Sequence, residues 1–136
     1  MPTFSKSSAE KLATCDKRLQ RVFNRVIQIV DCSILCGFRN QADQDKAFAD
    51  GFSKLKWPHG KHNKTPSLAV DAMRYPIDWK DEEGNRAFAQ LVKEAAAAEG
   101  VEIIWGGDWK SFPDPDHYEV KPLEDPTTGI AASLVT

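Results

Sequence analysis

A lone carboxylate, Asp71, interrupts an almost wholly apolar run of the chain at residues 68–73, Leu-Ala-Val-Asp-Ala-Met. Such a run is typical of a strand buried in a core. A carboxylate there costs free energy unless it is paired, hydrogen-bonded or bound to a metal ion. The chain must therefore fold so that a partner reaches Asp71. A nearby arginine such as Arg74, a metal ion, or a strand that is only half buried would each satisfy this constraint.

Hydrophobic periodicity predicts how the rest of the chain surrounds this strand. Residues 52–66 show neither the helical nor the strand period and contain Pro58, Gly60 and Pro66, which predicts a long ordered loop of the kind that often carries function. Gly100 is placed to end the helix before it. The predicted elements are helices at 7–14, 19–30, 40–51 and 81–99, and strands at 31–38, 68–73, 101–105 and 117–120.

This pattern predicts an α+β fold, with a small antiparallel sheet and helices packed on one side. The length of 136 residues fits one domain. We assign residues 1–121 to that domain. Residues 122–136 contain Pro, Gly, Thr and Ser without a clear period, and we expect them to form an irregular tail.

Composition excludes several classes of protein. The formal net charge is -2 and the basic residues form no long block, which argues against nucleic acid as a partner. No apolar segment reaches the roughly 18 residues of a membrane span, and the amino terminus lacks the apolar core of an export signal. We therefore expect a soluble protein without membrane insertion, and a monomer by default. The three cysteines, Cys15, Cys32 and Cys36, show no zinc-knuckle spacing, and we interpret the last two as small buried hydrophobes.

The segment 114–119 concentrates groups that carry chemistry. Alternate residues of a strand share a face, so His117 and Glu119 point one way and Tyr118 the other. Asp114 precedes His117 by three residues, across a turn at Pro115. A lone His-x-Glu pattern also occurs on exposed strand edges, but the added aspartate favours a site.

Two histidines and a carboxylate form a good zinc triad, with one coordination position left for water. Asp114 is the candidate that would take a proton from that water and pass it to a leaving amine. Glu119 would orient a ligating histidine or face the substrate. His59 lies between Pro58 and Gly60, which argues against a helical His-x-x-His pair, so we interpret it as a loop residue. Arg39 would bind a substrate carboxylate or an oxyanion, or would form only a surface ion pair, for example with Asp43.

Four motifs in order resemble those of the D-alanyl-D-alanine carboxypeptidase-like zinc peptidases, especially the small L-alanyl-D-glutamate endopeptidases that serve as phage endolysins. The resemblance covers roughly residues 4–120. The motifs are Gly37-Phe38-Arg39 with Gln41 and Gln44, Lys61-His62 through Asp71, Ile103 through Trp109, and Asp114-Pro115-Asp116-His117-Tyr118-Glu119.

The resemblance implies the small α+β fold of the D,D-peptidase and Hedgehog-like zinc peptidases. It implies Zn²⁺ held by His62, Asp71 and His117, with Asp114 as catalytic acid/base and Arg39 as the arginine that binds substrate or transition state. Trp105, Asp108 and Trp109 would shape the substrate floor beside the metal, and Glu119 would also face substrate. Asp116 stands where the family often has proline, which leaves open whether Asp114 or Asp116 is the acid/base.

The implied function is hydrolysis of the stem peptide of bacterial peptidoglycan during phage lysis. The enzyme would remain in the host cytoplasm until a membrane lesion releases it to the wall. A D-alanyl-D-alanine carboxypeptidase would use the same groups, and a non-catalytic zinc-containing wall-binding module would keep only the metal. A non-heme iron oxygenase also uses two histidines and a carboxylate, but the nearby Asp114 suits hydrolysis better.

Overall fold

The computed structural model describes residues 2–123 and confirms the predicted α+β class. Most of the predicted tail, 122–136, lies outside the described residues. Within them no helix is long and apolar enough to cross a membrane. The elements are α1 (Lys6–Leu12), α2 (Lys17–Val26), β1 (Cys32–Cys36), α3 (Gln41–Ala49), η1 (Lys61–Asn63), β2 (Ala69–Arg74), α4 (Glu82–Ala98), β3 (Ile104–Trp105), η2 (Gly106–Asp108) and β4 (His117–Glu119).

Each α-helix begins at a side chain that caps its free backbone amides. Ser5, Asp16, Asn40 and Asp81 accept hydrogen bonds from amides in the first turns of α1, α2, α3 and α4, respectively. Such caps stabilise a helix by about 1 kcal/mol. Gly100 follows α4 with φ 70°, a left-handed conformation that glycine adopts without strain, as the sequence predicted.

The four strands form one antiparallel sheet in the order β1-β2-β4-β3. The apolar strand β2 is central, and all its residues except the last are buried. Tyr118 pairs with Val70 across the β2–β4 ladder, and His117 pairs with Asp71. Partners in such a ladder project to the same side, so the register assigns Tyr118 and His117 to opposite faces.

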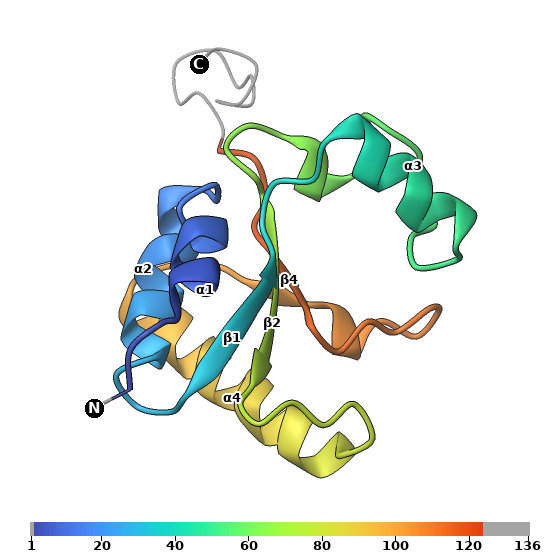
Figure 1. Cartoon of the computed structure of the whole chain (residues 1–136). Helices are drawn as coiled ribbons and strands as arrows, with labels where there is room; N and C mark the ends of the chain where they lie inside the picture. Colours follow the sequence, from blue (N-terminus) through green and yellow to red (C-terminus); the bar gives the residue numbers. More distant parts are fainter. Residues whose placement is uncertain (1, 124–136) are drawn as a thin grey trace.

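One face of the sheet carries the hydrophobic core. Figure 1 shows α1 and α2 on this side, and α4 packs against both α2 and β2. Tyr118 lies at the centre, with its ring edge-on to Phe23 of α2 (centroids 5.5 Å apart) and to Phe88 of α4 (6.4 Å). The prediction of helices on one side therefore holds for these three helices, while α3 lies apart from them, beyond the opposite face (Figure 1).

Two predicted elements have different bounds in the structure. The strand predicted at 101–105 is reduced to Ile104–Trp105, because β4 offers it only Glu119 and Tyr118 as partners. The backbone amide of Val101 instead donates to Ala96 O (2.8 Å), which extends the end of α4. The helix predicted at 19–30 begins earlier, after its Asp16 cap, and ends at Val26.

The opposite face of the sheet supports the loop 52–66, which is ordered around η1. Arg39 N donates to His62 O (2.8 Å), and Leu68 N donates to Lys61 O (3.0 Å). These bonds tie the loop to the ends of β1 and β2. Gly37 follows β1 and packs so closely against α1 that a Cβ atom would overlap Lys11 O and Thr14 Oγ1. This close approach sets the position of the Gly37 carbonyl.

We predict that replacing Tyr118 with Phe raises the free energy of unfolding by about 1 kcal/mol, because a buried hydroxyl without a partner costs about 1–3 kcal/mol. Within residues 2–123 the Tyr118 hydroxyl is fully buried and has no hydrogen-bond partner. Urea denaturation would measure the change. Tyr118→Ala is the control and should lose about 3–5 kcal/mol, because it removes the ring as well. A loss of stability in Tyr118→Phe would contradict the assignment.

Candidate active site

The register of the sheet places three functional side chains in a row across its open face. Asp71 of β2 pairs with His117 of β4 on one side and with Cys36 of β1 on the other. Because partners in antiparallel strands project together, all three point away from the helices. Glu119 lies two residues beyond His117 and shares this face, whereas Tyr118 does not, as the sequence predicted.

His62 reaches the same place from η1. Its Nδ1 lies 2.8 Å from Gly37 O, and its Nε2 lies 3.1 Å from Asp71 Oδ1. A carbonyl oxygen only accepts, so Nδ1 donates to Gly37 and Nε2 is turned toward Asp71. The close packing of Gly37 against α1 therefore orients the His62 ring.

His117 is oriented by a second acceptor. Its Nε2 donates to Glu119 Oε1 (2.8 Å), and the other oxygen of Glu119 lies 3.2 Å from Lys61 Nζ. The remaining nitrogen, Nδ1, lies 3.4 Å from Asp71 Oδ1. The rings of His62 and His117 are 5.2 Å apart, so each histidine presents one nitrogen to the same carboxylate.

The site has strong internal electrostatics because its charges are buried. Burial would raise the pKa of Asp71, but His62 and His117 outweigh it and hold the pKa well below its usual range. Burial would lower the pKa of His62, but the Asp71 carboxylate raises it to about 10. The pKa of His117 is raised in the same way, against burial, by hydrogen bonds to Asp71 and Glu119.

Asp114 and Asp116 lie in the loop that leads into β4, and both line the pocket. The loop is tied down by Asp114 N, which donates to Gly106 O (2.9 Å), and by Ala72 N, which donates to Asp116 O (2.8 Å). Burial, the Asp114 side chain and the Asp71 charge together raise the pKa of Asp116 to about 10. This shift favours the protonated form of Asp116, which can donate a hydrogen bond.

Arg39 enters the site from the loop after β1. Its guanidinium lies 3.6 Å from Asp71 Oδ2, and its Nη1 donates to Gln44 Oε1 (3.1 Å). The surface pair with Asp43 that the sequence left open is not formed in the described residues. Arg74, the other candidate partner of Asp71, pairs with Asp81 instead (2.6 Å).

Gln44 is a residue that sequence reasoning did not single out for a role. It is the only buried residue of α3, and its oxygen also accepts from Asn63 Nδ2 (3.0 Å). Its amide nitrogen donates to Ser53 Oγ (2.9 Å) and to Leu55 O (2.6 Å). One side chain therefore connects Arg39, the His62 turn and the outer loop. The sequence signal for Gln44 was its place in the motif that begins at Gly37, which gave the residue no role of its own.

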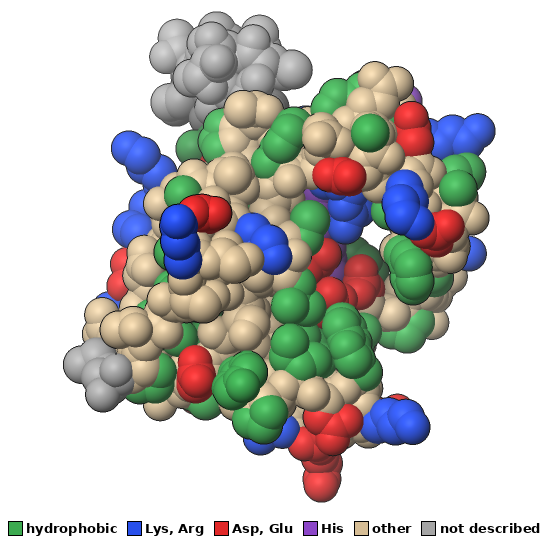
Figure 2. Space-filling model, in the orientation of Figure 1, with side chains coloured by type: hydrophobic (Ala, Val, Ile, Leu, Met, Phe, Trp, Pro, Cys, Tyr) green, Lys and Arg blue, Asp and Glu red, His purple; other side chains and the backbone are tan. Residues whose placement is uncertain are grey.

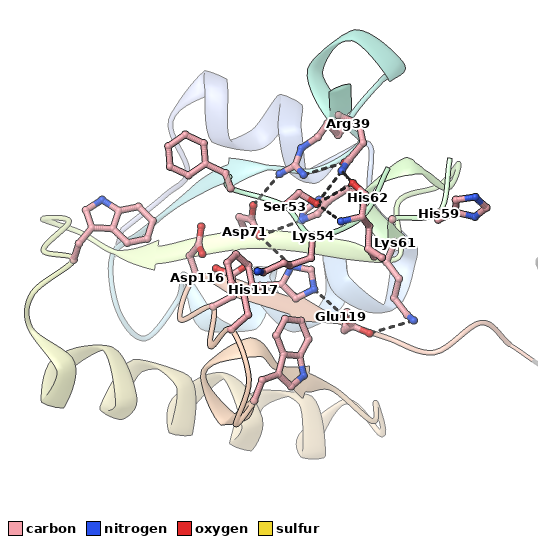
Figure 3. Close-up of a pocket in the computed structure, with 18 residues that line it drawn as sticks. Arg39, Ser53, Lys54, His59, Lys61, His62, Asp71, Asp116, His117 and Glu119 are labelled. Carbon is pink, nitrogen blue, oxygen red and sulfur yellow. Dashed lines mark hydrogen bonds and ion pairs between the residues drawn. The ribbon is translucent and has the colours of Figure 1, made fainter. Parts of the chain in front are cut away.

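These residues line a pocket of about 630 Å³ (Figures 2 and 3). Figure 2 shows acidic and histidine atoms on the floor of a hollow, with hydrophobic side chains along one rim. Of the predicted substrate residues, Trp109 and Glu119 line the pocket, and the Trp109 ring lies 5.1 Å from that of His117. His59 is at the rim and points away from the histidine pair (Figure 3).

Trp105 and Asp108 are placed elsewhere. Trp105 is buried, and its Nε1 donates to Pro115 O (2.8 Å), so it supports the loop that carries Asp114. Asp108 pairs with Lys93 of α4 (2.6 Å) at the surface. Neither lines the pocket.

The donor set fits a zinc ion. His62 Nε2, the Asp71 carboxylate and His117 Nδ1 converge, and each histidine donates its other nitrogen to an oxygen acceptor, the arrangement typical of ligating histidines. Among the described residues, the three side chains whose ligand atoms all lie within 4.8 Å of one another are Cys36, His62 and Asp71. His117 is not in that group and approaches the site through Asp71 Oδ1, 3.4 Å from its Nδ1. Cys36, which its apolar sequence context predicted to be a small buried hydrophobe, is therefore a further candidate ligand. The Cys36 thiol donates to Gly37 O (3.5 Å), the same carbonyl that orients His62.

Comparison with known proteins assigns the family. A family model described as phage L-alanyl-D-glutamate peptidase matches residues 2–128. The chain belongs to this family. The structure also resembles the crystal structure of the L-Ala D-Glu endopeptidase ChiX from Serratia marcescens, with a TM-score of 0.74 and 26% identity over 88% of this chain and 90% of that one. The family resemblance inferred from the four sequence motifs is confirmed.

We predict that Gln44→Met lowers the free energy of unfolding by about 2 kcal/mol or more, because it leaves partners in three segments unpaired, the buried Asn63 among them. Backbone amides of residues 52–60 should exchange hydrogen faster, while those of β2 should not. Hydrogen-exchange mass spectrometry would measure both. Gln41→Met, on the exposed side of the same helix, is the matched control. Equal exchange in the two variants would show that Gln44 does not hold the loop.

Proposed function

We propose that this chain is a zinc-dependent L-alanyl-D-glutamate endopeptidase that cleaves the stem peptide of bacterial peptidoglycan. Membership in the peptidase family supports the substrate class and the bond. The observation that carries the zinc assignment is the convergence of His62, Asp71 and His117, with each histidine oriented by its own acceptor. Three protein ligands leave one position open, as in catalytic rather than structural zinc sites.

A bound zinc ion would supply a Lewis acid that polarises the scissile carbonyl and lowers the pKa of a water molecule. Residues of the chain would transfer the protons and stabilise the negative charge that develops during the reaction. Asp114 would take a proton from the attacking water and return it to the leaving amine. Arg39 lies beside Asp71, where its guanidinium would stabilise negative charge that develops on the carbonyl oxygen.

Asp114 suits the role of base better than Asp116. A general base must begin the reaction as a carboxylate, whereas burial and neighbouring carboxylates raise the pKa of Asp116 to about 10. Asp116 would instead donate a hydrogen bond within the carboxyl pair. Trp109 would form the wall of the substrate site next to His117, and Glu119 would act through His117.

The cellular role that fits this activity is that of a phage endolysin acting on the host wall. The enzyme would remain in the host cytoplasm until a membrane lesion releases it, and it would act as a monomer without inserting into the membrane. A D-alanyl-D-alanine carboxypeptidase would need the same metal and arginine, and the products distinguish the two activities.

Digestion of purified peptidoglycan, followed by mass spectrometry of the fragments, tests the proposal. We expect new termini at L-alanine and D-glutamate, loss of activity after chelation, and recovery when zinc is restored. Release of free D-alanine alone would move the assignment to a carboxypeptidase. An intact wall under every condition would leave only a metal-binding module.

Two variants in the same experiment identify the ligand set. His117→Ala should lose zinc by elemental analysis along with activity, because ligand removal lowers affinity far more than loss of an orienting partner does. Cys36→Ser is the matched control from the other neighbour of Asp71 and should retain the metal. Loss of zinc in Cys36→Ser with zinc retained in His117→Ala would instead assign the Cys36 thiol as the third ligand.

Asp114→Asn should lower kcat about 10²- to 10⁴-fold, the usual contribution of a general acid/base, with zinc still bound. Asp116→Asn should stay within about tenfold of the wild type, because asparagine resembles the protonated acid in shape and hydrogen bonding. Steady-state kinetics on a soluble muropeptide, with metal content measured for each variant, checks both expectations. A larger loss of kcat in Asp116→Asn than in Asp114→Asn would make Asp116 the general base and Asp114 the hydrogen-bond donor.

A further inference from the structure

Lys54 is a cation in the pocket that has no carboxylate partner among residues 2–123. Arg39, Lys54 and Lys61 are the lysine and arginine residues that line the cavity. Arg39 lies next to Asp71, and Lys61 pairs with Glu119 at 3.2 Å. Across the described range 2–123, the Lys54 ammonium forms no ion pair and lies instead over the ring of Phe112, 4.9 Å from its centroid.

The surrounding loops hold Lys54 in this position. Its neighbours on both sides, Ser53 and Leu55, accept hydrogen bonds from the buried Gln44 side chain. Phe112 has φ 55°, a left-handed conformation that is uncommon for a residue with a large side chain. The two loops meet across the pocket, and Figure 3 shows Lys54 extending over the middle of the site rather than away from it.

An aromatic face is a weaker partner for an ammonium group than a carboxylate is in such a site. An incoming carboxylate can therefore displace the ring without breaking an existing ion pair. The same pocket has four carboxyl side chains, Asp71, Asp114, Asp116 and Glu119. Asp71 and Glu119 already have cationic partners in Arg39 and Lys61, so Lys54 is the lining cation that remains for an acidic ligand.

The stem peptide is such an acidic ligand. D-glutamate continues the chain through its γ-carboxyl group, so its α-carboxylate remains free beside the bond to L-alanine. In walls that contain diaminopimelate, the next residue carries a further free carboxylate. Some walls replace one of these groups with an uncharged amide.

We propose that Lys54 recognises a free carboxylate of the stem peptide and makes the enzyme discriminate against amidated peptidoglycan. This inference rests on the proposed function, because it assumes that the stem peptide occupies the pocket. Lys54 acts in substrate binding rather than in bond cleavage, so its contribution appears in KM. Both carboxylates have the same chemistry, and the experiment must distinguish them.

The test uses three soluble disaccharide-tripeptide muropeptides with the zinc-loaded full chain. One has both carboxylates free, the second carries an amide at the α-carboxyl of glutamate, and the third carries an amide at the diaminopimelate side chain. We expect one of the two amides to raise KM about fivefold, the scale of a partly exposed charge pair, with kcat changed less than about twofold. The sensitive position identifies the carboxylate that Lys54 binds.

Lys54→Met should raise KM for the free muropeptide by about the same factor and abolish the difference between substrates, while Lys54→Arg should retain it. Lys56→Met is the matched control, since Lys56 lies over Phe48 and does not line the pocket; it should behave as the wild type. Equal KM for all three substrates in the wild type, or discrimination that survives in Lys54→Met, would overturn the role of Lys54 and leave the endopeptidase assignment intact. Failure of the wild type to cleave any of the three would overturn both.

Discussion

A buried carboxylate at the centre of the sheet determines how the rest of this molecule is arranged. Asp71 lies on β2, where every residue from Ala69 to Met73 is buried. The cost of burying its charge is offset by groups that arrive from three other segments. His117 comes from the neighbouring strand, His62 from η1 and Arg39 from the loop after β1. Fold and site thus depend on the same contacts, because each segment that approaches Asp71 also closes one side of the pocket.

The buried Gln44 side chain holds together the loops on the other side of the pocket. Its four hydrogen-bonding contacts join the segment with Arg39, the turn with His62 and the outer loop with Lys54. A polar core residue of this kind is stable only when all its partners are present. The side of the pocket away from the sheet therefore has a small polar core in place of a hydrophobic one, and α3 serves to carry it.

Much of this arrangement could be predicted from the sequence, for identifiable reasons. Asp71 was conspicuous because a charge in an apolar strand needs a partner, and the alternation from His117 to Glu119 correctly separated the site face from the core face. Other residues are placed by contacts between distant segments, which local sequence patterns do not reveal. Cys36 reaches the site through its register with Asp71, Gln44 is buried only because the outer loop folds over it, and Trp105 supports a loop ten residues away. The length of β3 depends likewise on β4, which offers it only two partners, Tyr118 and Glu119.

The pairing of Asp71 with His117 also determines when, during synthesis of the chain, the site can form. These residues are partners in a ladder between strands far apart in the chain, and β4 lies between β2 and β3. A shift of one residue in that ladder would turn the His117 ring into the helix layer. No part of the chain that ends before β4 contains the complete constellation of side chains. Nearly all of the described segment must therefore be synthesised before these side chains can come together, so the order of synthesis delays the formation of the site.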